Sequence, residues 1–127
     1  MKLRSLKFKS VKSTNDIALM LIKKNSTRPS IILSEIQTKG RGTMGKKWVS
    51  KKGNLFLSIF FDMSKKKIDF KKFAVLNAYL LKSILTKKFS NKIKIKWPND
   101  LLFKKKKICG ILQETTINAG KKFLIVG

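Results

Sequence analysis

An aspartate and a lysine, Asp100 and Lys107, flank a predicted β-hairpin. Asp100 follows a strand and a turn, because Pro98 fixes its own φ and disfavours a helix at Trp97. If the hairpin closes, the carboxylate and the ammonium group face a common pocket. Asp100 could then hold Mg²⁺ directly or through water, since Mg²⁺ prefers oxygen ligands. The alternative is a plain turn in which Asn99 and Asp100 bond their own backbone.

A glycine-rich loop at Gly40–Gly45 supplies a second chemical feature. Glycines let the backbone approach an anion closely and offer its N–H groups as donors. Arg41, Lys46 and Lys47 could neutralise a triphosphate, and Trp48 could stack on an adenine ring. The spacing fits neither a Walker loop nor a dinucleotide fingerprint, so an ordinary surface loop stays open.

A third feature is the run Ser13-Thr14-Asn15-Asp16, which is typical of a helix N-terminus. Such an end presents hydroxyls and free N–H groups that a polar ligand could bind. The same residues have a purely structural explanation as a helix cap.

Hydrophobic periodicity predicts the elements that position these residues. We expect strands at Leu3–Val11, Ser30–Ile36, Asn54–Phe61, Lys92–Lys96, Cys109–Thr115 and Phe123–Val126, and helices from Ser13 to about Lys24 and from Asp69 to about Phe89. Lys104–Lys107 belongs to the hairpin tip. The apolar residues expected on one side of a strand are Leu55, Leu57, Ile59 and Phe61, and those expected on the core face of the second helix are Phe73, Leu76, Leu80, Ile84 and Leu85.

These elements predict one α+β domain over residues 1–127, with a single mixed or antiparallel sheet and helices packed on one face. A hydrophobic content of 43% is enough for one core. No apolar run is long enough to span a membrane, so we expect a cytoplasmic protein without membrane contact.

Composition excludes several classes of site. One cysteine and no histidine argue against a disulfide framework, a zinc site and a histidine-dependent triad. The net charge of +25 favours nucleic acid as a partner, but 28 of the basic residues are scattered lysines, whereas specific readout prefers arginine. We therefore expect no specific nucleic acid partner. Lysine is the usual cation of this sequence, so the arginine between Gly40 and Gly42 indicates that the planar guanidinium group is needed at this position.

The motifs together resemble those of biotin–protein ligases. The matching segments are Ser13-Thr14-Asn15, Gln37 through Trp48, Lys96–Leu102 and Lys107–Leu112, and the resemblance extends from Ser13 to Gly127. It implies the biotin–lipoate ligase catalytic fold, which is like that of class II aminoacyl-tRNA synthetases. It also implies an enzyme that uses ATP and Mg²⁺ to attach biotin to a lysine of an acceptor protein domain, such as the biotin carboxyl carrier domain of acetyl-CoA carboxylase, through biotinyl-adenylate.

The resemblance also implies roles for single residues. Lys107, Arg41 and Asp100 would be catalytic, with Lys107 near the α-phosphate and Asp100 as a Mg²⁺ ligand, and the biotin ureido ring would lie at Ser13-Thr14-Asn15. The residues implied to bind biotin or the adenylate are Ser13, Thr14, Asn15, Gln37, Gly40, Arg41, Gly42, Trp48, Asn99, Lys107 and Gly110.

The sequence departs from the family pattern in three places. Thr43 stands where many members carry a second loop arginine, no helix-turn-helix region precedes Ser13, and the chain ends at Gly127 where members continue. We therefore expect the N-terminal portion of a catalytic domain, without a DNA-binding domain and inactive when isolated. The oligomeric state stays open between a monomer and a homodimer.

Two other functions remain open. A lipoate–protein ligase or octanoyltransferase would share the fold, and in octanoyltransferases a cysteine is the nucleophile. Cys109 lacks a histidine to activate it and lies in an apolar strand, so a small buried residue is the better interpretation. A nonenzymatic basic nucleic-acid-binding domain is the alternative from another class.

Overall fold

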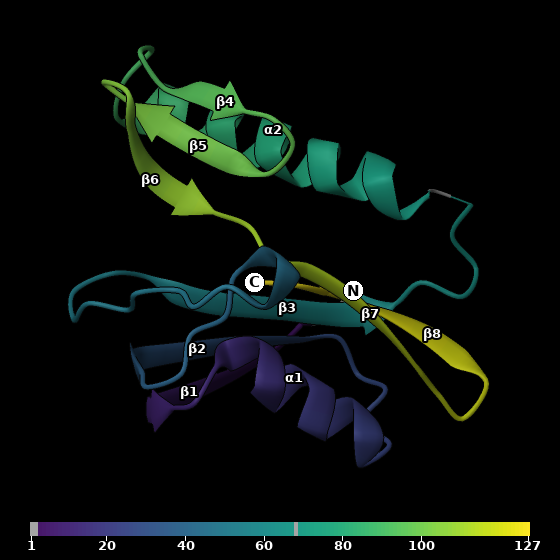
Figure 1. Cartoon of the computed structure of the whole chain (residues 1–127). Coiled ribbons are helices and arrows are strands. Elements are labelled where there is room, and N and C mark those ends of the chain that lie inside the picture. Colours follow the sequence, from purple (N-terminus) through teal and green to yellow (C-terminus); the bar gives the residue numbers. More distant parts are fainter. Residues whose placement is uncertain (1–2, 68) are drawn as a thin grey trace. The chain divides into compact units, whose positions relative to one another are not determined.

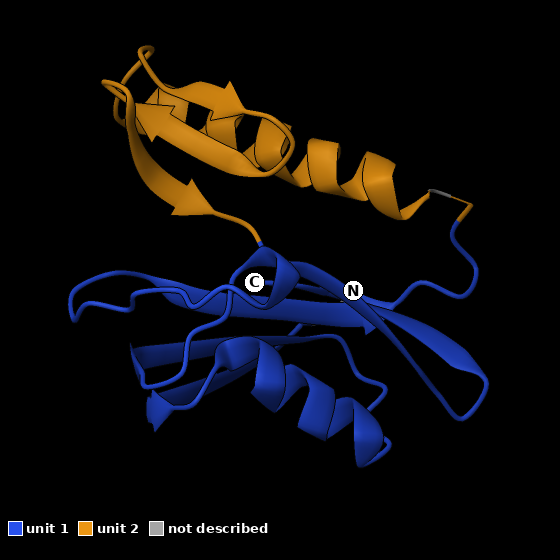
Figure 2. Cartoon of the chain, in the orientation of Figure 1, with its two compact units in different colours: residues 1–66, 112–127 blue, residues 67–111 orange. Residues whose placement is uncertain are grey.

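The computed structural model describes residues 3–67 and 69–127, and it contains two sheets where the sequence predicted one. The larger sheet has the strand order β1-β2-β3-β8-β7, and the smaller has the order β4-β5-β6 (Figure 1). The chain divides into unit 1, residues 1–66 and 112–127, and unit 2, residues 67–111 (Figure 2). The predicted α+β class with a mixed sheet is confirmed.

Unit 1 contains the larger sheet, an α-helix and a short 3-10 helix. Its elements are β1 (Arg4–Val11), α1 (Thr14–Lys23), β2 (Ser30–Gln37), the short 3-10 helix η1 (Thr43–Gly45), β3 (Phe56–Asp62), β7 (Gln113–Asn118) and β8 (Lys121–Val126). The β1 and β2 strands are parallel, whereas the other neighbours are antiparallel. A parallel pair needs a crossover connection, and α1 provides it.

The predicted first helix is confirmed as α1. Ser13 is its N-cap, and the Ser13 hydroxyl accepts a hydrogen bond from the Asp16 N–H at 3.4 Å. Asp16 in the first turn and Lys23 in the last turn complement the helix dipole. A cluster of buried residues that includes two from α1 consists of Ala18, Ile22, Ile32, Phe60, Phe123 and Ile125. Burial of this face holds α1 against the sheet.

The strand predicted at Asn54–Phe61 is β3, but the core lies on its other face. Phe56, Ser58 and Phe60 are buried, whereas Leu55 is 76% exposed. Leu57, Ile59 and Phe61 are only half-buried. Alternation of side chains along the sequence identifies the two faces of a strand, but it does not show which face packs against a helix. In the structure, α1 packs on the face that carries Ser58 and Phe60. A serine therefore occupies a fully buried position.

Unit 2 pairs the second helix with the small sheet. Its elements are α2 (Phe70–Lys88), β4 (Lys94–Lys96), β5 (Asp100–Phe103) and β6 (Lys106–Gly110), and α2 contacts β4 and β5. Asp69 caps α2 by accepting from the Lys71 N–H at 2.9 Å. The helix prediction is thus confirmed, but only part of its expected core face is covered. Phe73 and Leu85 are half-buried, whereas Leu76, Leu80 and Ile84 are exposed. Three short strands cover only one side of a helix of this length.

The predicted hairpin is confirmed, and its return strand is shorter than expected. The tip is at Lys104 and Lys105, which both have positive φ. The segment predicted as one strand, Cys109–Thr115, is divided between the two sheets, because β6 ends at Gly110 and β7 begins at Gln113. The Leu112 and Gly127 backbones exchange two hydrogen bonds of 2.8 and 2.9 Å, which draws the chain after Ile111 into the larger sheet.

Candidate functional site

Buried polar side chains gather at the N-terminus of α1. Ser13, Thr14 and Asn15 are each less than 5% exposed. The Thr14 N–H and hydroxyl donate to Gln37 Oε1 at 2.8 and 3.1 Å. The Ser58 hydroxyl lies 2.7 Å from Thr14 Oγ1 and donates to Asn15 Oδ1. The helix cap is thus also the centre of a hydrogen-bond network. A structural role as a cap and a role in binding a polar ligand are therefore compatible for this run.

Gln37 connects this network to the glycine-rich loop. It is the last residue of β2, and its Nε2 donates to the Ser50 hydroxyl at 3.2 Å. Because its Oε1 holds Thr14 and its Nε2 holds Ser50, both ends of the amide are committed within unit 1. Gln37 therefore fixes the loop relative to the start of α1.

Arg41 lies between two carboxylates. Its Nη1 and Nη2 donate to Glu114 Oε1 and Oε2, each at 2.8 Å, and its Nε donates to Asp16 Oδ1 at 2.9 Å. Glu114 Oε2 also accepts from Asn15 Nδ2 at 2.8 Å. Bidentate pairing of this kind is the strongest geometry available to arginine. One guanidinium and two carboxylates leave a cluster with a formal charge of one negative.

The electrostatics follow from this pairing. The hydrogen bond with Glu114 raises the pKa of Arg41, with further contributions from the charges of Glu114 and Asp16. Burial alone would raise the pKa of Glu114, but the hydrogen bonds from Arg41 and Asn15 and the charge of Arg41 outweigh it, so that pKa is lowered. Arg41 was expected to bind an anion, yet the anions next to it are already the protein's own carboxylates.

The sequence did not identify Glu114 or Asp16 as site residues. One signal was available: the chain has six acidic residues against 31 basic ones, so each carboxylate is unusual in this composition. Nothing in the sequence pairs positions 41 and 114, however, since they lie in different segments of the fold.

The pH dependence of stability should report the Glu114 interaction. Because its folded pKa is lowered, the stabilisation is complete above the ordinary glutamic acid pKa of about 4.3 and is lost as the pH falls through the lower folded value. Thermal unfolding measured from pH 6 downwards should therefore show a smaller acid-induced loss in Glu114→Gln than in the parent. Equal losses in both proteins would show that Glu114 makes no such contribution.

The glycine-rich loop closes on itself. The Trp48 N–H donates to the Gly40 carbonyl at 2.9 Å, the Gly42 N–H donates to the Lys46 carbonyl at 2.7 Å, and Arg41 forms a bridge with Lys47. The N–H groups of Gly42 and Trp48 are therefore engaged within the loop. Lys46 and Lys47 are exposed, Trp48 is half-buried, and Thr43 lies at the tip in η1.

Gly40→Ala should disturb this closure. A Cβ at Gly40 would lie 2.8 Å from the Trp48 carbonyl oxygen and closer still to the Ser50 hydroxyl, so the backbone must move. We expect a loss of about 1 to 3 kcal/mol in unfolding free energy, the usual cost of overpacking. Gly42→Ala is the matched control, because a Cβ there meets its nearest neighbour at an ordinary 3.4 Å. Urea denaturation measures both, and equal losses would contradict the close approach at Gly40.

Unit 2 brings together the carboxylate and the lysine singled out in the sequence. Lys107 Nζ lies 2.8 Å from Asp100 Oδ1. A register shift between Leu101 and Leu102 pairs Leu102 with Lys107, so Lys107 shares a face of the hairpin with Asp100. Such bulges re-aim side chains. Here the bulge produces the ion pair.

The other predicted residues of unit 2 lie nearby along the hairpin. Asn99 has a structural role, because its Nδ2 donates to the Ile111 carbonyl at 2.8 Å and its carbonyl accepts from the Ile111 N–H at 3.0 Å. Gly110 pairs with Asp100 in the strand register. Burial raises the pKa of the Cys109 thiol, with the charge of Asp100 adding to the effect, and this disfavours the thiolate that a nucleophile needs.

Within the described residues, Asp100 is not part of a cluster of three metal-ligating side chains. In the ranges 3–67 and 69–127, no three histidine, cysteine, aspartate or glutamate side chains come together. Asp100 already pairs one oxygen with the Lys107 ammonium group, which competes with any cation for the carboxylate. Its geometry fits the positioning of Lys107 better than the holding of Mg²⁺.

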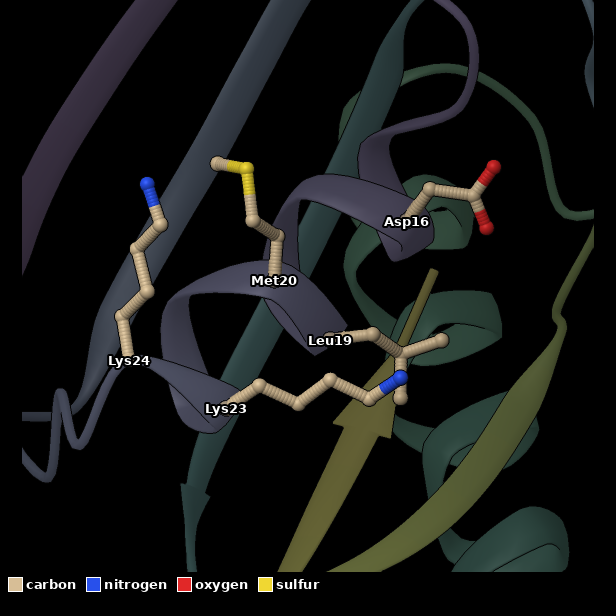
Figure 3. A pocket seen from close by; sticks show the side chains of 5 residues that line it. All are labelled: Asp16, Leu19, Met20, Lys23 and Lys24. Carbon is tan, nitrogen blue, oxygen red and sulfur yellow. The ribbon is translucent and has the colours of Figure 1, made fainter.

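A hollow of about 450 Å³ lies on the exposed side of α1 (Figure 3). It is lined by Asp16, Leu19, Met20, Lys23 and Lys24, all from this one helix or its C-cap. Among the described residues, polar groups from other segments do not line it, so it lacks the convergent groups of a ligand pocket. The candidate site remains the buried network around Thr14 and Asn15.

Comparison with known proteins identifies the family. The model of the biotin/lipoate A/B protein ligase family matches residues 7–127. The chain belongs to this family. It is 35% identical over 95 residues to the bifunctional ligase/repressor BirA of Escherichia coli, an alignment that covers 74% of this chain and 30% of BirA. The chain thus spans about a third of the length of this curated relative.

Solved structures of family members have the same fold. A biotin acetyl coenzyme A carboxylase synthetase from Helicobacter pylori, with bound biotinylated ATP, is 27% identical and superposes with a TM-score of 0.83 over 98% of this chain and 60% of that one. A biotin protein ligase from Aquifex aeolicus, in complex with biotin and ATP, is 27% identical with a TM-score of 0.75 over 97% and 50%. The biotin–protein ligase resemblance and the fold are therefore confirmed.

No helix within residues 3–67 and 69–127 is long and apolar enough to cross a membrane.

Proposed function

We propose that this protein takes part in the ATP-dependent attachment of biotin to a lysine of an acceptor protein domain. The observation that carries the proposal is the match of 98% of the chain to a synthetase structure that holds biotinylated ATP. The two motifs expected to contact such a ligand each form internal contacts: the buried hydrogen-bond network at Ser13-Thr14-Asn15 in unit 1 and the Asp100–Lys107 ion pair in unit 2.

The reaction would proceed in two steps. The biotin carboxylate attacks the α-phosphorus of ATP and pyrophosphate leaves, which gives biotinyl-adenylate. The acceptor lysine amine then attacks the acyl carbon, loses a proton and expels AMP. Both reactants of the first step are anionic, so its main requirement is stabilisation of negative charge and alignment. This requirement suits a chain that has no histidine and whose cysteine thiol has a pKa raised by burial.

We assign the charge stabilisation of the first step to Lys107. Asp100 would hold its ammonium group in place before ATP binds, as the 2.8 Å ion pair indicates. Arg41 fits a direct contact with phosphate less well, since Glu114 and Asp16 occupy its donors. Mg²⁺ would accompany ATP and be held mainly by its phosphates, a common arrangement for this ion.

We assign biotin recognition to the network in unit 1. Ser13, Thr14 and Asn15 would receive the polar ureido ring, with the Gly40–Trp48 loop contributing to adenylate binding. The acceptor would be a protein domain that carries the target lysine. A cytoplasmic location is a further part of this proposal.

Calorimetric titration tests the proposed function. The protein should bind biotin more tightly than lipoate. Preference for lipoate would instead favour a lipoate ligase. Binding of unrelated nucleic acids without any response to biotin would favour the basic-domain alternative, and its affinity would fall steeply with salt.

A further inference from the structure

Glu114 joins three segments that are remote in sequence. It lies in β7, and its carboxylate accepts from Asn15 at the start of α1 and from Arg41 in the glycine-rich loop. One oxygen, Oε2, lies 2.8 Å from both Asn15 Nδ2 and Arg41 Nη2. The Glu114 side chain is only 24% exposed, so these interactions are partly shielded from water.

The carboxylate also determines the orientation of the Asn15 amide. A carboxylate only accepts hydrogen bonds, so the Nδ2 end of Asn15 must point toward Glu114. The Leu112 carbonyl, 3.3 Å away, reinforces this orientation, and the Oδ1 end then accepts from Ser58. With a neutral amide at position 114, the opposite orientation of Asn15 would no longer place its Oδ1 against a carboxylate, and only the Leu112 carbonyl would oppose it.

Arg41 completes the arrangement as a counter-ion. Without it, Glu114 would be a half-buried carboxylate without a counter-ion, and only hydrogen bonds such as that from Asn15 would offset its desolvation. The bidentate contact therefore links the position of the loop to the same group that orients Asn15. Both parts of the expected biotin site in unit 1 depend on one carboxylate.

We infer that Glu114 is a positioning residue of the biotin site, which sets the orientation of Asn15 and, through Arg41, anchors the glycine-rich loop. This inference rests on the proposed function. It also assigns Arg41 to the positioning of the loop, where the sequence had indicated a direct contact with phosphate.

The test compares three variants by biotin titration well below their melting temperatures. Glu114→Gln keeps the size of the side chain and removes its charge, and should weaken biotin binding about ten- to a hundredfold, as expected for lost charge-assisted hydrogen bonds. Asp16→Asn removes the other carboxylate at Arg41 and leaves the side-chain hydrogen-bond partners of Asn15 unchanged, so its effect should be much smaller. Glu35→Gln makes the same charge change at an exposed site of β2 and should bind biotin like the parent.

A second readout does not depend on biotin. Hydrogen exchange of the 37–48 segment should be faster in Glu114→Gln than in the parent or Glu35→Gln, because the loop loses its anchor. Parent-like biotin affinity in Glu114→Gln, or an equal loss in Glu35→Gln, would overturn the positioning role while the proposed function stands. If the parent protein does not bind biotin, the proposed function is refuted. Unchanged hydrogen exchange of the 37–48 segment in Glu114→Gln would then refute the anchoring role separately.

Discussion

Replacing Lys107 with alanine should slow adenylate formation by about a hundred- to several-thousandfold, with a much smaller change in biotin affinity. A cation that acts mainly on charge developing in the transition state is worth about 3 to 5 kcal/mol. Asp100 holds the Lys107 ammonium group at 2.8 Å, so the charge is positioned before substrate binds. Pyrophosphate release by the full-length protein measures the rate, and calorimetry measures biotin affinity.

Lys105→Ala is the matched control for this substitution. Lys105 lies at the tip of the same hairpin and is exposed. Its replacement removes the same formal charge and leaves the Asp100–Lys107 ion pair in place. We expect almost no change in rate. Equal losses at Lys105 and Lys107 would mean that the overall charge of +25 attracts ATP, and the assignment of Lys107 would fail.

Phe60→Ala should cost about 3 to 5 kcal/mol of unfolding free energy, the usual range for removing a fully buried aromatic ring. Phe60 is fully buried in β3 and belongs to the cluster that holds α1 against the sheet. Loss of this packing should also loosen the N-terminus of α1, so biotin affinity should fall with stability. Urea denaturation gives the free energy.

The control is Leu55→Ala, next to the same strand. Leu55 is 76% exposed, and its truncation should change the unfolding free energy by less than about 0.5 kcal/mol. The pair also tests which face of β3 carries the core. A large cost at Leu55 with a small cost at Phe60 would restore the face that the sequence had indicated and contradict the structure.

Local features were determined by the sequence alone. The cap at Ser13, the length of α1, the hairpin tip after Phe103 and the strand before Gln37 all follow from interactions between residues close in the chain. The family was also evident from sequence, since its motifs are short runs whose residue types and order survive without knowledge of the fold. Such signals need no long-range contact.

Tertiary structure decided the rest. The bulge that aims Lys107 at Asp100, the core face of β3 and the division into two sheets depend on pairing between segments, and hydrophobic alternation does not encode these choices. The same holds for the contacts of Arg41 and Asn15 with Glu114. A carboxylate attracts any nearby cation, so its partner is fixed only when folding brings one guanidinium within hydrogen-bond distance and partly shields the pair from water.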